Sequence, residues 1–196
     1  MITAIKRYIP RQVKRTIKRL ARNIVESVQY YGTSWYRLFI LRSPINRTIS
    51  SIIFVCKGNV CRSAFAELRL QYLLDSKSIQ VDSCGIDVDQ GDYAPADSVS
   101  VAADFSCSLK GRRSKGLSAC NFQAADLICS MEYWQYKRLL YLYPEKKENI
   151  VLLRNLAPFP WRLLCNIDDP YGLEINEFRR VYKLIDRSLL QIRQWC

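Results

Sequence analysis

The stretch of sequence that decides the fold is Ile52-Ile53-Phe54-Val55-Cys56-Lys57-Gly58-Asn59-Val60-Cys61-Arg62-Ser63-Ala64-Phe65-Ala66-Glu67. It begins with a β-branched and aromatic run, which is typical of a buried strand. Gly58 and Asn59 follow, and both tolerate a left-handed backbone. From Arg62 onward, apolar residues recur with helical spacing. The stretch therefore predicts a strand, a tight loop and a helix, with Cys56 at the end of the strand and Arg62 at the start of the helix.

A loop that runs into a helix N-terminus is a favourable place for a phosphate group. Its unpaired N–H groups and the helix dipole attract anions, and successive N–H groups can form a phosphate-binding nest. The Arg62 guanidinium can grip two phosphate oxygens at once. The same field favours the thiolate of Cys56, which is the nucleophilic form. Ser63 and Asn59 are expected to support the sulfur and the loop. A buried, inert cysteine is the alternative, and the strand-to-helix position argues against it.

The segment Val55–Ser63 resembles the signature loop of the low-molecular-weight protein tyrosine phosphatases. The chain order agrees with that family, because Asp169-Pro170-Tyr171-Gly172 supplies the matching late motif. Other phosphatases with a Cys-x5-Arg loop usually carry a histidine before the cysteine, whereas this chain contains no histidine. The resemblance covers roughly residues 50–196 and leaves the first fifty residues unexplained.

The resemblance implies a two-step phosphatase reaction. Cys56 is the expected nucleophile, Arg62 the phosphate clamp, and Asp169 the general acid and base. The expected phosphate-binding residues are Lys57, Gly58, Asn59, Val60, Cys61 and Arg62. Asp-Pro-Tyr-Gly alone would be ordinary turn chemistry, and Asp168 is a neighbouring candidate, but the family motif places the acid directly before the proline.

Further residues gain roles only through the resemblance. Ser83 matches a serine that braces the loop, and it is expected to bond the Asn59 amide. Arg112 stands where relatives have a bracing histidine. Val60 keeps an aliphatic residue that favours a phosphotyrosine pocket over the threonine of arginine phosphatases.

The walls of the substrate cleft depart from the family pattern. Tyr171 matches one aromatic wall. On the second wall, where relatives place an aromatic residue or a histidine, this chain offers Asp89 and then Tyr93. An acidic rim around residues 87–90 is expected to repel acidic phosphopeptides. The expected substrates are phosphotyrosine proteins or small phosphomonoesters.

The remaining pattern predicts an α/β fold with a four-stranded parallel sheet and helices on both faces. Ligands bind such sheets beyond the carboxyl ends of the strands, which is where Cys56 stands. The expected strands are 51–56, 79–86, 125–131 and 149–154, and the expected helices are 62–74, 96–105, 132–142 and one from about residue 175.

The first fifty residues carry eleven Lys and Arg against one acidic residue, so they hold most of the net charge of +12. A helix from Arg11 is expected to be amphipathic, with one apolar and one basic face. An aromatic and basic segment at 35–42 and a linker at 43–47 follow. We therefore predict a helical extension over 1–48 and a phosphatase domain over 49–196.

Three interpretations of the extension stay open. Residues 11–42 could bind an anionic membrane surface. The helix could instead pack its apolar stripe on the phosphatase domain with its charged face in solvent. An arm for nucleic acid is a third, less favoured interpretation because no base-reading motif accompanies it.

The eight cysteines are scattered, which favours reduced thiols and a cytoplasmic location, peripheral at the membrane if the extension binds there. No apolar run is long enough to span a bilayer, and no motif suggests a metal or nucleotide cofactor. Cys61 is interpreted either as a redox partner of Cys56 or as a buried loop cysteine. Two rival functions are a thioredoxin-coupled arsenate reductase, which needs relay cysteines such as Cys107, Cys120 or Cys129, and a tethered, non-catalytic phosphoprotein-binding protein.

Overall fold

The structure is a computed structural model, and it describes residues 10–33, 49–75, 79–88 and 91–196. The predicted aromatic segment at 35–42 and the linker at 43–47 lie outside the described residues. The domain boundary at 48/49 therefore stays a prediction. Within the described ranges, no helix is long and apolar enough to cross a membrane.

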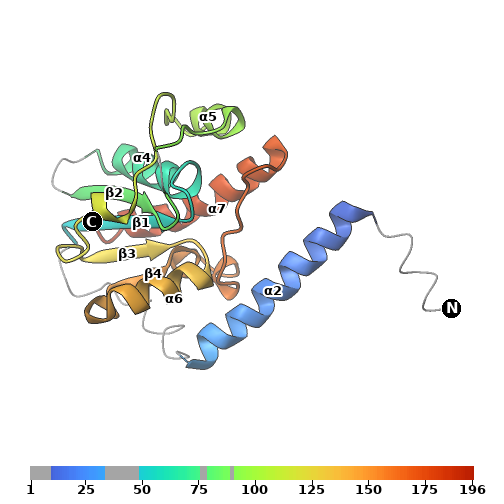
Figure 1. Cartoon of the computed structure of the whole chain (residues 1–196), viewed down its shortest axis with the longest axis horizontal. Helices are drawn as coiled ribbons and strands as arrows, with labels where there is room; N and C mark the ends of the chain where they lie inside the picture. Colours follow the sequence, from blue (N-terminus) through green and yellow to red (C-terminus); the bar gives the residue numbers. More distant parts are fainter. Residues whose placement is uncertain (1–9, 34–48, 76–78, 89–90) are drawn as a thin grey trace.

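Four parallel strands form the sheet, in the order β2-β1-β3-β4. They are β1 (Ser51–Cys56), β2 (Gln80–Gly85), β3 (Leu127–Ser130) and β4 (Ile150–Leu152). The chain leaves β1 towards β2 on one side and later returns to β3 on the other side (Figure 1). The strand order thus reverses at β1, and the carboxyl end of β1 is where a ligand is expected in such a sheet.

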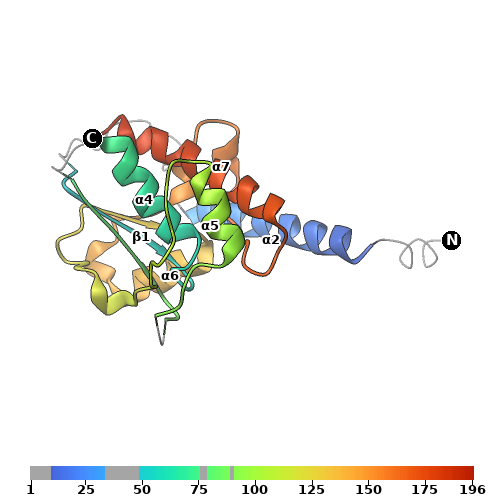
Figure 2. The same ribbon diagram turned by 90° about the horizontal axis from the view of Figure 1, so that it is seen from above.

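Helices cover both faces of the sheet, as predicted. Along β1, Ile52, Phe54 and Cys56 pack into one core cluster, while Ile53 and Val55 pack into the other. The first cluster contains residues of α4 (Arg62–Leu74), α5 (Ala96–Ala103) and α7 (Ile175–Arg193), and the second contains residues of α6 (Tyr133–Leu142). Figure 2 shows α4 and α7 on the opposite side of the sheet from α6.

Element boundaries differ from the predictions by a few residues. β3 and β4 are shorter than the predicted 125–131 and 149–154. β4 ends early because the chain turns into the 3-10 helix η3 (Leu153–Leu156) directly after it. Other short 3-10 helices are η1 (Leu117–Ala119), η2 (Pro144–Lys146) and η4 (Trp161–Leu163).

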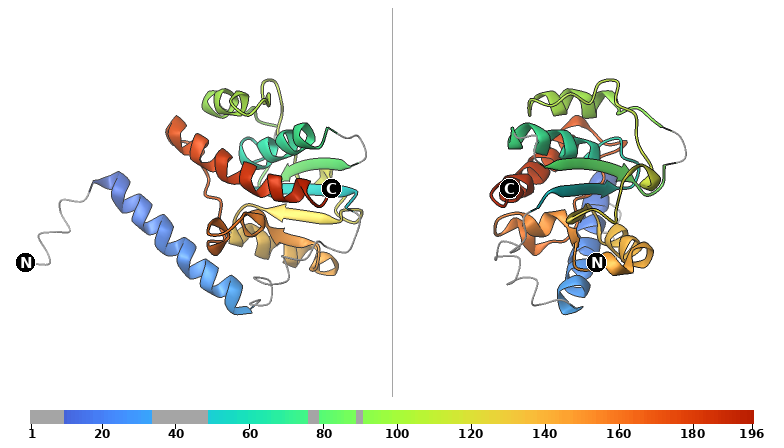
Figure 3. Two further views of the ribbon diagram at one scale, coloured as in Figure 1. Left: turned by 180° about the vertical axis from the view of Figure 1, so that it is seen from behind. Right: turned by 90° about the vertical axis from the view of Figure 1, so that its left-hand side faces the viewer.

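The extension forms one long helix, α2 (Arg11–Thr33), and this helix crosses the end of the sheet towards which the strands point (Figure 3). Its contacts with the domain are polar. The amide of Asn23 exchanges hydrogen bonds with the backbone of Asn166, and the Ser27 hydroxyl accepts one from the Cys165 N–H at 2.9 Å. Near the C-terminal end of α2, Tyr30 enters the core, and the half-buried Tyr31 packs against the same core cluster.

Of the three interpretations of the extension, packing of the apolar stripe of this helix on the domain does not agree with the described residues. The large apolar side chains of the stripe are 44–67% exposed; they are Val13, Ile17, Leu20, Ile24, Val25 and Val28. The middle of α2 instead meets backbone groups and carboxylates of the 165–169 segment and α7. Such a surface matches asparagine, serine and arginine side chains, so the helix turns its polar side inward.

Candidate active site

The loop between β1 and α4 has the conformation that its sequence predicted. Asn59 adopts a positive φ of 50°, and Cys61 caps the N-terminus of α4. The carbonyls of Cys56 and Lys57 accept hydrogen bonds from the N–H groups of Ile86 and Asp87, at 3.0 and 2.9 Å. These bonds fix the loop against the end of β2.

Gly85 allows this close approach and was missed by the sequence reasoning. A Cβ atom at Gly85 would lie 2.7 Å from the Lys57 carbonyl oxygen and 2.9 Å from the Asn59 nitrogen. Both are backbone atoms, so the loop would have to move. The local sequence Ser83-Cys84-Gly85 carried a signal, since a glycine at a strand end often marks such an approach.

Cys56 lies at the bottom of a cleft with two polar groups around its sulfur. Its Sγ lies 3.0 Å from the Ser63 hydroxyl, and the Asn59 backbone N–H donates to it at 3.2 Å. Ser63 was predicted to support the sulfur, and its position agrees. These two contacts fix the position of the sulfur in the cleft.

A buried network holds the Asn59 side chain, and with it the loop. The Asn59 amide donates to Ser83 Oγ at 2.7 Å, as expected, and to Ser63 Oγ at 2.9 Å. Its Oδ1 accepts from Arg112 Nη1 at 3.2 Å. Arg112 also pairs with the Glu67 carboxylate. Arg112 thus occupies the bracing place that the resemblance suggested for it, and Glu67 is a partner that the sequence did not reveal.

Arg62 is 1% exposed and lies between two carboxylates. Its Nη2 is 2.7 Å from Asp169 Oδ2, its Nη1 is 3.3 Å from Glu132 Oε1, and Nη1 also donates to the Ile167 carbonyl at 3.0 Å. Burial lowers the pKa of Arg62, but Glu132 and Asp169 outweigh it, so the pKa is raised and the charge is retained. Among the described residues, Arg62 Nε has no hydrogen-bond partner and is buried. A donor of this kind suits an incoming phosphate oxygen.

Glu132 was not among the predicted site residues. It lies two residues after the end of β3, and its carboxylate also accepts a hydrogen bond from Trp134 Nε1 at 2.6 Å. The carboxyl ends of parallel strands meet at one edge of a sheet, so a carboxylate just after β3 could have been placed beside Cys56 on that ground.

Asp169 stands at the mouth of the cleft. Its side chain is 36% exposed, and its Oδ1 accepts from the Tyr171 N–H at 3.2 Å. The pairing of Asp169 with Arg62 brings the candidate acid, the clamp and the sulfur together around one space. A carboxylate at the mouth can give a proton to a leaving oxygen that points outward.

The cleft itself has a volume of about 230 Å³. It is lined by the loop residues Cys56–Gly58 and Val60–Arg62 and by Asp87, Val88, Asp92, Tyr93, Asp169 and Tyr171. The two tyrosines predicted for the cleft wall, Tyr93 and Tyr171, both line the cleft, and their side chains are largely exposed. Asp89 lies outside the described residues, whereas Asp87 and Asp92 supply acidic groups on the cleft wall.

Cys61 shares the loop with Cys56 but differs in environment. It is buried, and burial raises the pKa of its thiol to about 12. Cys61 is therefore protonated at neutral pH. A disulfide between Cys56 and Cys61 stays a prediction.

Helix α2 borders the site through two arginines. Arg19 pairs with Asp168 at 3.4 Å and with Glu177 at 3.3 Å, and Arg22 pairs with Asp168 at 3.1 Å. Asp168 precedes the candidate acid, so the extension is tied to the segment that carries Asp169. Sequence periodicity could not reveal this tie, because it identifies faces but not their partners.

Fold and site together define a phosphatase with a cysteine nucleophile loop. The family model of the low molecular weight phosphotyrosine protein phosphatases matches residues 51–195, and the chain belongs to this family. Helix α2 lies outside the matched residues. The chain is thus a phosphomonoester hydrolase of that class.

Individual proteins of this family are similar to the chain in sequence and in structure. The low molecular weight protein-tyrosine-phosphatase Wzb of Escherichia coli K12 is 34% identical over 147 residues, covering 75% of this chain and 93% of Wzb. The phosphatase Etp of the same strain is 30% identical, covering 71% of this chain and 89% of Etp. The crystal structure of Vibrio vulnificus Wzb in complex with benzylphosphonate aligns with a TM-score of 0.64 at 28% identity, covering 74% of this chain and 98% of that chain.

Proposed function

We propose that this protein hydrolyses phosphotyrosine in proteins through a phosphocysteine intermediate on Cys56. One observation carries the proposal: the Cys56 sulfur, the buried Arg62 guanidinium and the Asp169 carboxylate border one cleft at the end of β1. The relatives named as tyrosine phosphatases support the choice of substrate.

The reaction follows from these positions. Cys56 thiolate attacks phosphorus, and a sulfur–phosphorus bond forms as the ester phosphorus–oxygen bond breaks. Asp169 gives its proton to the departing oxygen. The loop N–H groups and Arg62 hold the three remaining phosphate oxygens. Water then attacks phosphorus, its proton passes to the Asp169 carboxylate, and the sulfur leaves as thiolate with release of inorganic phosphate.

The cleft walls suit an aromatic leaving group. Tyr93 and Tyr171 both line the cleft beside the loop, so the ring of a phosphotyrosine can lie between or against them. Small phosphomonoesters would fit the same space and serve as assay substrates. We propose no cofactor for the reaction, because the loop and Asp169 supply all the groups that it needs.

The experiment compares the wild type with Cys56→Ser on para-nitrophenyl phosphate and on tyrosine-phosphorylated lysate proteins. We expect turnover by the wild type and essentially none by the variant, because an alcohol is a far weaker nucleophile than a thiolate. Cys196→Ser removes an exposed thiol remote from the cleft and serves as the matched control. Equal activity of Cys56→Ser and the wild type would refute the proposed role of Cys56.

The arsenate reductase alternative has less support in the structure. It needs thiols that relay a disulfide, yet Cys129 is fully buried in β3 and Cys107 is 7% exposed, so only Cys120 of the three candidates is half-buried. That alternative would be favoured if the wild type oxidised thioredoxin in the presence of arsenate and a Cys107→Ser variant did not.

We also propose that residues 11–42 bind an anionic membrane surface. The apolar stripe of α2 faces outward and is uncovered among the described residues, and basic side chains such as Lys14 lie on the same helix. An apolar face combined with basic residues is the pattern of an interfacial helix. The protein would then lie at the cytoplasmic face of the membrane.

Sedimentation with liposomes tests this association. The variant Leu20→Glu/Ile24→Glu should no longer sediment with vesicles that contain anionic lipid, whereas Tyr72→Glu/Tyr141→Glu, which alters exposed aromatic residues of α4 and α6, should still do so. If both variants sediment as the wild type does, the apolar stripe has no role in membrane binding.

A further inference from the structure

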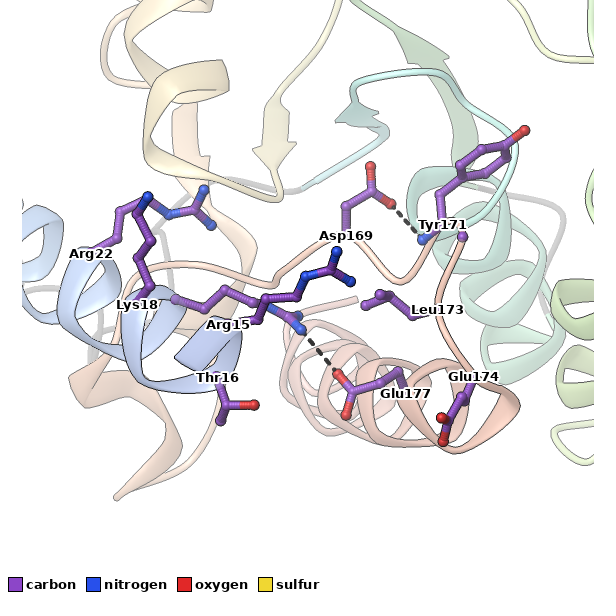
Figure 4. Close-up of a pocket in the computed structure, with 11 residues that line it drawn as sticks. Arg15, Thr16, Lys18, Arg22, Asp169, Tyr171, Leu173, Glu174 and Glu177 are labelled. Atoms are coloured by element: carbon purple, nitrogen blue, oxygen red, sulfur yellow. Dashed lines mark hydrogen bonds and ion pairs between the residues drawn. The ribbon is translucent and has the colours of Figure 1, made fainter. Parts of the chain in front are cut away.

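A large recess adjoins the catalytic cleft and is formed in part by the extension. It has a volume of about 940 Å³ and lies between α2 and the segment that follows Asp169. It shares Asp169 and Tyr171 with the catalytic cleft, so the two spaces meet at the candidate acid. Figure 4 shows Arg15 extending from α2 towards the segment with Asp169 and Leu173.

The positive charges on the α2 side of this recess fall into two groups. Arg19 and Arg22 are neutralised by Asp168 and Glu177. In the part of the chain that the structure describes, Arg15 and Lys18 form no ion pair, yet both line the recess. Two cations that form no ion pair among the described residues therefore stand next to the catalytic cleft, in a recess that Glu174 also lines.

Acidic residues also line the catalytic cleft and the recess. Asp87 and Asp92 line the catalytic cleft but not the recess. Glu174 and Glu177 lie on the α7 side of the recess, and Glu177 is already paired with Arg180 and Arg19. A negative group of a bound substrate meets Arg15 and Lys18 on the α2 side, whereas, among the described residues, the side with Asp87 and Asp92 carries two carboxylates against the single cation Lys57.

We propose that Arg15 and Lys18 form an anion-binding subsite that selects phosphotyrosine peptides with acidic groups next to the phosphotyrosine. The inference rests on the proposed phosphatase function and adds a substrate class to it. The subsite belongs to the extension and lies outside the residues that the family model matches. It also modifies the expectation of an acidic rim, because repulsion of acidic phosphopeptides holds for one side of the cleft only.

The test uses synthetic phosphotyrosine peptides that are identical except for three Glu or three Gln residues, placed before or after the phosphotyrosine. In the wild type we expect a higher kcat/KM for one acidic peptide than for its Gln counterpart. Arg15→Gln and Lys18→Gln should each reduce this preference by about 1.5- to 5-fold, the range of a partly exposed ion pair. The preference should also shrink with added salt.

Lys14→Gln is the matched control, because it removes one charge from the neighbouring position on α2 and Lys14 does not line the recess. An equal effect of Lys14→Gln and Arg15→Gln would show general charge attraction and overturn the subsite. A wild type without any preference for the acidic peptides would also overturn it.

Binding to the Cys56→Ser form separates this proposal from the phosphatase itself. If that form binds the acidic peptide more tightly in an Arg15-dependent manner while the wild type turns over no phosphotyrosine, the subsite stands and the proposed function fails. If Arg15→Gln/Lys18→Gln abolishes sedimentation with anionic liposomes but leaves peptide preference intact, the two residues serve the membrane and the subsite is refuted.

Discussion

Arg62 is held by two carboxylates, and this arrangement links binding to catalysis. We propose that a phosphate gripped by Nε and Nη2 of Arg62 displaces Asp169, which lies 2.7 Å from Nη2. Asp169 is then released at the mouth of the cleft, where the leaving oxygen arrives. Glu132 stays on the other side of the guanidinium and keeps it in place.

Replacing Asp169 separates the chemical step from phosphate binding. Asp169→Ala should lower kcat by about 10²–10⁴-fold, the usual contribution of a general acid. Inhibition by inorganic phosphate should be at least as strong as in the wild type, because phosphate no longer has to displace the Asp169 carboxylate from Arg62. Steady-state kinetics with phosphate as inhibitor measures both values. A kcat within threefold of the wild type would exclude Asp169 as the acid.

Glu132 is expected to be a positioning residue that acts through Arg62. Glu132→Gln keeps the shape but removes the charge, so it weakens a charge-assisted bond worth about 1.5–3 kcal/mol. We expect kcat/KM to fall roughly 10-fold or more with a weaker phosphate affinity, whereas Glu132→Asp should recover part of it. If Glu132→Gln lowers the melting temperature but leaves phosphate affinity unchanged, the role of Glu132 is structural only.

At the scale of elements, the unit formed by β1, the loop and α4 is local, and its sequence predicted it well. Glycine, asparagine and a β-branched strand are signals within sixteen residues, and Cys56, Ser63 and Ser83 stand where they were expected. The orientation of α2 is not local. Periodicity identified its apolar face correctly, but the surface it meets is contributed by residues 132–136 and 162–177, more than 100 positions away. The contact of Glu132 with Arg62 is non-local in the same way.

Tyr30 anchors α2 to the domain. It is 1% exposed and meets Tyr136 and Tyr133 edge to face, with ring centroids 5.3 and 6.2 Å apart. Tyr30→Ala should lower the free energy of unfolding by about 3–5 kcal/mol, the usual cost of removing a buried aromatic ring. Urea unfolding measures this, and Val28→Ala, which shortens an exposed side chain on the same helix, is the control. A cost below 0.5 kcal/mol would show that α2 does not dock as described.

At the scale of the whole molecule, the extension carries most of the net charge and directs part of it at the catalytic end of the sheet. Arg19 and Arg22 bind carboxylates beside Asp169, while the apolar stripe faces away from the domain. The outer side of this helix can therefore bind the membrane while its inner side contacts the segment that carries Asp169. The docking of its inner side depends on carboxylates and hence on pH.

The lowered pKa of Glu177 shows in which direction pH changes the stability of the folded protein. Its hydrogen bond with Arg180, and then the charges of Arg180 and Arg19, lower its pKa below the usual value of about 4.3. Since the folded state holds the proton less tightly, the stabilisation is complete above the unfolded pKa and is lost as pH falls through the folded pKa. Melting temperatures of the wild type between about pH 5 and pH 3 should fall more steeply than those of Glu177→Gln. Parallel curves would contradict this.

The most direct measurement is the capture of the phosphorylated enzyme. Wild-type protein is mixed with para-nitrophenyl phosphate, quenched within milliseconds and digested, and the peptides are examined by mass spectrometry. We predict one phosphate on the Cys56 sulfur of the wild type. The Cys56→Ser variant, treated in the same way, should yield no peptide with phosphate on a cysteine. Continued turnover with no phosphate on Cys56, or with phosphate on a different residue, would contradict the mechanism.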